Sequence, residues 1–337
     1  MELIEVVKMV VMWLIGFALI YLAVKKEYEP NLLLPMGFGT ILVNLPNSGV
    51  LNQNMEGIGE IHGIIQWLYE VGIEASEAFP ILLFIGIGAM IDFEPLLQRP
   101  ILALYGFAAH LGIFVAIGLA LLMGFNVADA FSIGIIGAAD GPTAILVTKT
   151  LAPALLGAIA IAAYSYMALI PMIQPPFMKL FTTSEERKIV MTNLRSVTKT
   201  EKVLFPIIVT LIVCIIVPDA APLVGFLMFG NLLNVCGVTD RLSKTAQNEL
   251  MNIVTIFLGI SVGATASAAN FLRLETIFII CLGLVAFSIS TCGGLITAKI
   301  MNWLSGGKIN PLIGSAGVSA VPMAARVSQT VGQKEDP

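Results

Sequence analysis

The chain has 337 residues, of which 57% are hydrophobic and 12% are charged, with a formal net charge of −4. Soluble domains carry about 25% charged residues, so the composition indicates a polytopic membrane protein and excludes an ordinary soluble enzyme. The sequence contains no long basic or acidic run, and we therefore expect no nucleic-acid partner.

The first half of the chain is a series of apolar segments, several of them close to the ~20 residues that a membrane-spanning helix needs. Residues 47–76 interrupt the series with a polar loop that contains no Lys or Arg. Pro35 and Gly37 interrupt the second segment. The predicted segments are 6–24, 31–46, 78–91, 101–124, 131–151 and 153–178.

A hydrophilic stretch then divides the chain. Residues 182–202 carry five Lys or Arg residues, and the next apolar segment begins at residue 203. We therefore divide the chain into a first membrane repeat (1–180), a cytoplasmic linker (181–202) and a second membrane repeat (203–337).

Short motifs recur in the same order in the two halves. The last two matching pairs are separated by 175 and 177 residues. Shared order and spacing indicate an internal duplication, as in transporters that are built from repeats. The pairs are "FGTIL" at Phe38 with "FGNLL" at Phe229, "GIGAM" at Gly86 with "SVGAT" at Ser261, and "IGAADGPT" at Ile136 with "IGSAGVSA" at Ile313.

The loop charges suggest how the repeats are oriented. Lys and Arg concentrate in cytoplasmic loops, so the linker is expected inside and the loop 47–76 outside. Segment 131–151 must then enter the membrane and turn back, and its equivalent, 310–326, enters from the opposite side. The predicted fold class is an all-α polytopic membrane protein with two inverted-topology repeats, whose broken or re-entrant helices meet near the bilayer midplane. The second repeat ends before a counterpart of 153–178, so we expect it to lack its final helix.

The stretch "GAADGPTAI", residues 137–145, places an acid beside two helix-disrupting residues. Asp140 suits the N-cap of a helix, with Pro142 in the first turn. A Ser or Asn would cap without the ~2.5–3.5 kcal/mol that a charge costs at membrane depth. A carboxylate beside exposed backbone carbonyls suits a cation, so we interpret Asp140 as an ion- or proton-coupling residue as well as a cap.

The matching element is "NPLIGSAGVSAVPMAAR", residues 310–326. Asn310 and Ser319 offer oxygen ligands, and Gly314 allows close approach of the backbone. Arg326 is open to two interpretations. Its side chain either snorkels to the cytoplasmic face or receives a carboxylate in a bidentate fork.

A third stretch, "AAYSYMALIPMIQPP", holds polar side chains inside the span 153–178. Tyr164 suits a membrane interface. Tyr166 lies deeper, where it could relay a proton or join an ion shell. Gln174, followed by two prolines, is expected to end the helix.

These three stretches together resemble the beta subunit of the sodium ion-translocating biotin-dependent decarboxylases, the group that acts with oxaloacetate, methylmalonyl-CoA, glutaconyl-CoA or malonate decarboxylases. The resemblance covers nearly the whole chain. It implies a multi-pass subunit of the bacterial or archaeal cytoplasmic membrane that decarboxylates carboxybiotin, exports sodium and consumes a proton. The one local departure is Ala138, where the family pattern suggests a glycine.

The resemblance also assigns roles to residues and implies partners. Asp140, Tyr166 and Arg326 are the expected catalytic residues, with Arg326 holding the carboxybiotin carboxylate. The expected sodium ligands are Asp140, Asn310, Ser319 and Gly314. The implied partners are a biotin-carrier subunit, a carboxyltransferase alpha subunit and a small membrane gamma or delta subunit, in an oligomeric complex.

A sodium-coupled secondary transporter of a carboxylate solute is the alternative, because such a protein would share the inverted repeat and the midplane acid. Carboxybiotin turnover by a purified complex distinguishes the two. A transporter would instead accumulate its solute with no biotin carrier present.

Overall fold

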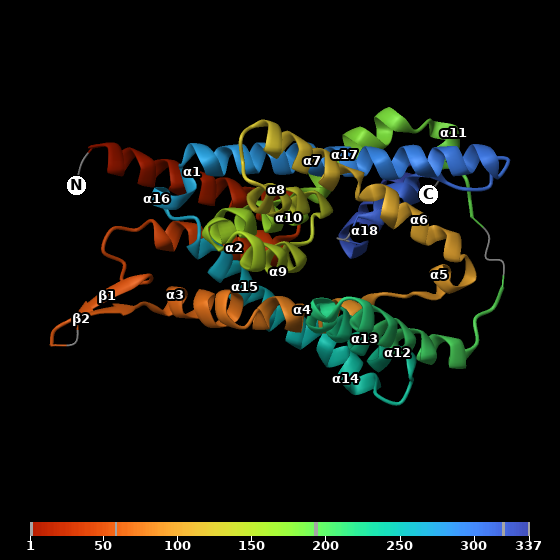
Figure 1. Ribbon diagram of the computed structural model, residues 1–337, viewed down its shortest axis with the longest axis horizontal. Helices are drawn as coiled ribbons and strands as arrows, with labels where there is room; N and C mark the ends of the chain where they lie inside the picture. The colour runs from red at the N-terminus through yellow and green to blue at the C-terminus, as the bar shows by residue number, and fades with distance from the viewer. Residues whose placement is uncertain (1–2, 58, 192–194, 319–320, 336–337) are drawn as a thin grey trace.

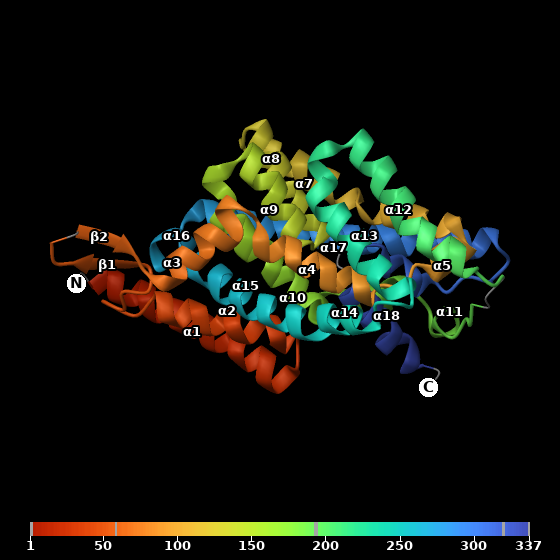
Figure 2. The same ribbon diagram turned by 90° about the horizontal axis from the view of Figure 1, so that it is seen from below.

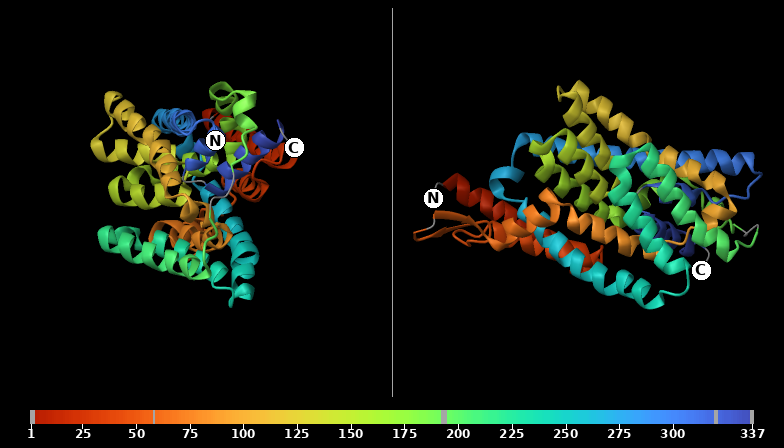
Figure 3. Two further views of the ribbon diagram at one scale, coloured as in Figure 1. Left: turned by 90° about the vertical axis from the view of Figure 1, so that its right-hand side faces the viewer. Right: turned by 60° about the horizontal axis from the view of Figure 1, so that its bottom comes forward.

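The computed structural model describes residues 3–57, 59–191, 195–318 and 321–335. Helices make up most of this part of the chain, which confirms the all-α membrane class. Within the expected loop, β1 (Asn52–Met55) pairs with β2 (Gly59–His62) in an antiparallel hairpin. The hairpin lies at one end of the elongated molecule, the hairpin end, and α5 (Glu94–Gln98) and α11 (Ser184–Arg187) lie at the other, the linker end (Figures 1 and 3).

Most helices of the first half lie in the predicted segments, but α3 and η1 lie within the predicted polar loop 47–76, and α2 continues through Pro35 and Gly37 without a break. They are α1 (Leu3–Lys26), α2 (Pro30–Val43), α3 (Ile64–Tyr69), η1 (Glu70–Ala75), α4 (Ala78–Met90), η2 (Pro100–Leu102), α6 (Ala103–Ala109), α7 (Leu111–Leu122), α8 (Val127–Gly134), η3 (Ile135–Ala138), α9 (Gly141–Leu151), η4 (Pro153–Leu155) and α10 (Leu156–Phe181).

The second half begins inside the predicted linker, because a Thr198–Glu201 capping box starts a helix at Lys199. Its elements are α12 (Lys199–Ile216), η5 (Pro218–Ala220), α13 (Ala221–Val235), α14 (Asp240–Thr245), η6 (Ala246–Leu250), α15 (Met251–Ala264), α16 (Ala268–Phe271), α17 (Leu274–Leu304), η7 (Pro311–Gly317) and α18 (Val321–Gln333).

Within the described residues, four helical segments are long and apolar enough to cross a membrane. A fifth is a broken pair, Ile64–Ala75 with Ala78–Met90, whose axes bend by 68°. These lengths agree with the ~20 residues of a spanning helix and confirm the polytopic prediction. The four segments are Leu3–Lys26, Pro100–Leu122, Pro153–Phe181 and Leu274–Leu304.

Helix α10 lies in the middle of the molecule and is buried along most of its length. The prediction that Gln174 ends this helix is wrong, because the helix continues through Pro175 and Pro176 to Phe181. Proline removes one backbone donor and disturbs a helix in water. Within a membrane bundle, neighbouring helices supply the partners that make such a proline tolerable. Gln174 is therefore a fully buried amide within the bundle.

Two close helix crossings join the halves of the chain, α2 with α15 and α4 with α13. A Cβ added to Gly39 would overlap the Ile260 backbone, and one added to Gly88 would overlap the Leu227 backbone. Helices α2 and α13 carry one matched motif pair, and α4 and α15 carry another. Replacing both helices of one crossing by their counterparts therefore gives the other crossing, as the predicted duplication requires. The inversion of the two halves stays a prediction.

Candidate functional site

The chain breaks between α8 and α9, where the sequence predicted a helix start. Ala139 has φ 52°, in the left-handed region that a residue with a Cβ adopts at a cost of about 1–2 kcal/mol. Asp140 follows as the N-cap of α9, which confirms its predicted position. Its carboxylate makes no capping hydrogen bond with the α9 backbone, and its Oδ2 accepts the Thr143 hydroxyl at 2.5 Å. The half-buried carboxylate thus bonds to a hydroxyl within the first turn of its own helix.

The ring of Tyr164 fixes the first residue of α9. Gly141 packs so closely against this ring that an added Cβ would overlap three ring carbons. The prediction that Tyr164 lies at a membrane interface is wrong, because its exposed fraction is 0%. Its ring packs against α9, and its hydroxyl has no hydrogen-bond partner among the described residues.

A cavity of about 660 Å³ opens beside Asp140, within the range of small-molecule sites. Its lining includes Asp140 and Thr143 and also Glu29 and Arg326. The remaining lining is mainly apolar and comes from α4, α13 and α15. The cavity therefore brings the predicted ion-coupling acid and the predicted anion receptor to one enclosed space.

Arg326 projects from α18, where its guanidinium Nη1 lies 3.4 Å from Glu29 Oε1. The Arg326 side chain is 64% exposed, whereas Glu29 is 16% exposed. Burial raises the pKa of the Glu29 carboxyl, and the Arg326 guanidinium opposes that rise. The ion pair therefore holds the Arg326 guanidinium at the cavity and leaves most of its N–H donors accessible.

Tyr166 is placed differently from the other predicted catalytic residues. Its hydroxyl donates to the backbone carbonyl of Ile280 in α17, and its ring packs beside Gly283. The cavity lining includes its neighbour Met167 but not Tyr166. In this arrangement, Tyr166 joins α10 to α17.

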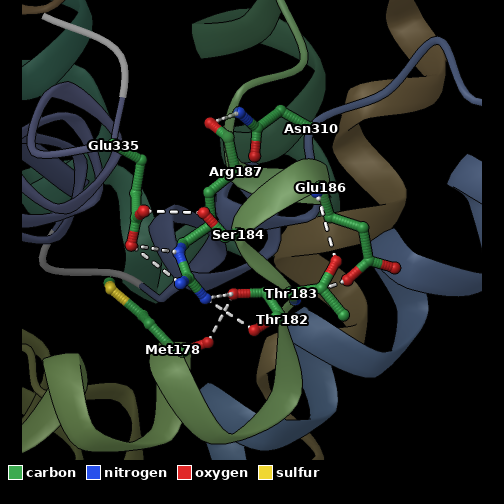
Figure 4. Close-up of polar contacts among 8 residues, drawn as sticks. All are labelled: Met178, Thr182, Thr183, Ser184, Glu186, Arg187, Asn310 and Glu335. Carbon is green, nitrogen blue, oxygen red and sulfur yellow. Dashed lines mark hydrogen bonds and ion pairs between the residues drawn. The ribbon is translucent and has the colours of Figure 1, made fainter.

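Asn310 and Gly314, two predicted sodium ligands, lie away from this cavity. Asn310 Nδ2 donates to the carbonyls of Arg187 and Ile189 in the linker, at 2.9 and 3.1 Å (Figure 4). Its Oδ1 accepts the backbone N–H of Leu312 at 3.0 Å. Gly314 packs against the Gly294 backbone of α17 too closely for a Cβ. Ser319, the remaining predicted ligand, lies outside the described residues.

The linker is tied to the C-terminal part of the chain by the Arg187 cluster, which comprises Arg187, Thr182, Ser184 and Glu335 (Figure 4). Arg187 Nη2 lies 2.8 Å from Glu335 Oε1, and Nη1 donates to the Thr182 carbonyl at 2.6 Å. The Ser184 hydroxyl donates to Glu335 Oε2 at 2.7 Å. Asn310 and this cluster together fix the linker beside η7 and α18.

A buried polar network around Gln174 is the main feature that the sequence analysis missed. Gln174 Nε2 donates to the Ser315 carbonyl at 3.1 Å, and its Oε1 has no partner among the described residues. Ser315 Oγ shares a hydrogen bond of 2.7 Å with Ser328 Oγ. The network joins α10, η7 and α18. A lone amide in the middle of an apolar span was the available signal, because buried amides require partners.

Comparison with known proteins gives consistent matches along the chain. A sequence profile described as the Na⁺-transporting oxaloacetate decarboxylase beta subunit matches residues 8–337. The glutaconyl-CoA decarboxylase subunit beta of Acidaminococcus fermentans is 55% identical, over 97% of this chain and 84% of its own. The methylmalonyl-CoA decarboxylase subunit beta of Veillonella parvula is 54% identical over the same shares. The probable oxaloacetate decarboxylase beta chain of Vibrio cholerae is 48% identical, over 96% of this chain and 87% of its own.

Proposed function

Because the chain belongs to the family of beta subunits of sodium-transporting decarboxylases, we propose that it decarboxylates carboxybiotin and couples this step to sodium export. The observation that carries the proposal is the shared cavity of Asp140 and Arg326. It combines a fixed cation for an anionic substrate with a carboxylate for a transported cation.

The anionic substrate enters the cavity at Arg326. A guanidinium binds a carboxylate through two parallel N–H hydrogen bonds. The Arg326 side chain is exposed enough to donate such bonds. Glu29 holds the guanidinium at the wall through their ion pair. The apolar lining excludes water from the carboxylate, which favours its loss as neutral carbon dioxide.

Decarboxylation breaks the bond between the ureido nitrogen of carboxybiotin and its carboxyl carbon. Carbon dioxide leaves, and the nitrogen keeps the electron pair and takes a proton. Asp140 is the group in the cavity wall that can release this proton when a sodium ion binds to it. Sodium and a proton compete for one carboxylate, so loading the ion and protonating biotin become one coupled exchange.

The sodium ion is held by oxygen atoms at the α8–α9 break. Asp140 supplies charge, the Thr143 hydroxyl lies beside it, and the backbone carbonyls of the break add neutral ligands. Asn310 and Gly314 enter the proposal as residues that hold the second broken element against the linker and α17. Tyr166 enters as the contact that ties α10 to α17.

Transport requires that the ion site open to one side of the membrane at a time. Each sodium ion moved against 100 mV costs about 2.3 kcal/mol, so a leak would uncouple the reaction. Two repeats that move against each other provide alternating access. The partners that we propose are a biotin carrier, a carboxyltransferase alpha subunit and a small membrane subunit, in an oligomer within a prokaryotic cytoplasmic membrane.

The substitution Asp140→Asn in the reconstituted complex tests the proposal. It removes the charge that holds sodium and the proton, so sodium-dependent decarboxylation should fall at least ~100-fold, as for loss of an essential acid–base group. Asp129→Asn is the control, because Asp129 is a half-buried residue of α8 that exchanges hydrogen bonds with nearby Asn126 and does not line the cavity. Full sodium-dependent turnover by Asp140→Asn would refute the role of Asp140, and solute uptake without a biotin carrier would refute the function.

A further inference from the structure

A second buried carboxylate, Glu77, lies at the other helix break of the first half. It occupies the junction between η1 and α4, where the two helix axes bend by 68°. Its φ is 54°, in the left-handed region, and its exposed fraction is 6%. Glu77 therefore repeats two features of the Asp140 site, an acid within apolar surroundings and an irregular backbone beside it.

Oxygen atoms of this junction bind the ammonium group of Lys149. Lys149 Nζ lies 3.3 Å from Glu77 Oε1 and donates to the Ala75 carbonyl at 2.9 Å. The Lys149 side chain is 35% exposed, so solvent reaches the site from this side. A carboxylate and a backbone carbonyl are the types of oxygen that also bind a sodium ion.

Helix α9 connects this junction to the proposed ion site. Asp140 caps the N-terminus of α9 and Lys149 lies in its last turn, about 13 Å further along at 1.5 Å per residue. The cavity includes Asp140 but neither Glu77 nor Lys149. The two sites also lie toward opposite ends of α4 (Figures 1 and 2). Glu77 precedes the first residue of α4, which follows α3 and the hairpin. The last turn of α4 lines the cavity and leads toward α5.

Two fully buried hydroxyls without hydrogen-bond partners in the described part of the chain accompany α9. One belongs to Thr148, which lies on the same buried face of the helix as Gly141. The other belongs to Tyr164, whose ring packs on Gly141. Buried hydroxyls normally have partners. The Thr148 and Tyr164 hydroxyls lack such partners and accompany the helix that connects the Asp140 and Glu77 carboxylates. They could therefore bind a polar ligand, such as an ion, in passage between the two sites.

We propose that the Glu77 carboxylate and the Ala75 carbonyl form a release site for sodium, and that the Lys149 ammonium displaces the ion from it. This inference rests on the proposed function. A tethered cation that competes for the site prevents it from staying loaded and blocks re-entry from the release side. Because Glu77 is buried, its ionised carboxylate requires a cation as a partner, and either of the two cations can serve.

A matched pair elsewhere in the chain provides the control. Lys299 Nζ lies 3.3 Å from Glu186 Oε2 and donates to the Phe181 carbonyl at 3.1 Å. This pair has the same chemistry as the Lys149 pair, but it lies beside the linker and is more exposed, at 46% for Lys299. Loss of Lys299 should leave sodium inhibition unchanged.

The experiment uses the complete complex in proteoliposomes, with sodium varied separately on the loading and release sides. In Lys149→Met, sodium on the release side should inhibit decarboxylation at a concentration at least tenfold lower than in the unsubstituted complex. Lys149→Gln should behave likewise, because it keeps a donor for Ala75 but lacks the charge, and Lys149→Arg should restore normal inhibition. The sodium dependence on the loading side should change less than twofold, which also shows that the variants are folded.

Inhibition from the release side that is identical in Lys149→Met, Lys149→Gln and Lys299→Met would overturn the inference. Glu77→Gln provides an independent measurement, since it should lower sodium exported per carbon dioxide at least tenfold. Unchanged export in that variant would also overturn the inference. Failure of the proposed function is a different result, namely that the unsubstituted complex shows no sodium-dependent decarboxylation at all.

Discussion

The contact between Gly141 and Tyr164 allows a sharp test of how Asp140 is positioned. Gly141 directly follows Asp140, and a methyl group there would overlap the Cε1, Cζ and Cδ1 atoms of the Tyr164 ring. Tyr164 has no exposed surface and is enclosed by neighbouring helices, so its ring has little room to move. The substitution Gly141→Ala must therefore displace the start of α9.

Two opposing effects determine the size of the change. Alanine favours a helix over glycine by at most about 1 kcal/mol, and by less at the first helical position. Forcing a methyl group into a packed core costs about 1–3 kcal/mol, so we expect a net loss of stability. Displacement of a reacting group by about 1 Å can cost ~100-fold in rate. The turnover number should therefore fall between about 10- and 100-fold.

The assays are thermal unfolding in detergent and sodium-dependent decarboxylation by the reconstituted complex. Gly118→Ala is the control, because an added Cβ at this position in α7 meets no atom within 4 Å. It should keep its activity and become slightly more stable. Tyr164→Leu combined with Gly141→Ala should recover part of the stability lost by Gly141→Ala alone. Normal stability and turnover in Gly141→Ala would refute the argument that the Tyr164 ring sets the position of Asp140.

Two further predictions concern the linker. Asn310→Ala removes two donors to linker carbonyls, a loss of about 1–3 kcal/mol; trypsin should then cut at Lys188 faster, while Asn126→Ala, a change at the α8 cap, should leave this rate unchanged. The pKa of Glu335 lies below its ordinary value because the Ser184 hydroxyl and the Arg187 guanidinium favour the carboxylate. Its contribution to stability is therefore present at neutral pH and lost as the pH falls through that lowered pKa. The unfolding temperature of Glu335→Gln should lie below that of the unsubstituted chain at pH ~7 and converge with it below pH ~4; a constant difference over this range would contradict the assignment.

The fold class could be predicted from the sequence because the spanning segments exceed any soluble pattern in apolar length. Segment boundaries agreed where an apolar run ended in charges, as α1 does at Lys25 and Lys26. They failed where local rules conflict with the environment. Gln174 and its following prolines would end a helix in water, but in α10 they lie in the bundle. The hairpin was missed because four-residue strands leave almost no periodic signal.

Individual candidate residues stood out in the sequence, but the way in which the structure groups them did not. Asp140 and Arg326 line one cavity although 186 positions separate them, whereas Asn310 belongs to the same motif as Arg326 and bonds to the linker. A motif shows which residues are unusual for their surroundings. It does not show which side of a helix faces a cavity, and that depends on the close crossings of other helices. Tyr164 illustrates this limit. The sequence around it suggested a position at the membrane interface, but the structure buries its ring against Gly141.

The reason for an acid at the α8–α9 break can now be argued from two separate costs. Ala139 takes a left-handed backbone that glycine would adopt freely, and Asp140 places a charge where serine or asparagine could cap. The carboxylate accepts the Thr143 hydroxyl, but an uncharged cap could accept the same bond, so this local contact does not account for the charge. Strain and charge that exceed what a helix cap requires are typical of functional sites. The carboxylate instead faces a cavity that also holds Arg326, so the N-cap position explains where Asp140 lies, and the proposed sodium ion explains why it is an acid.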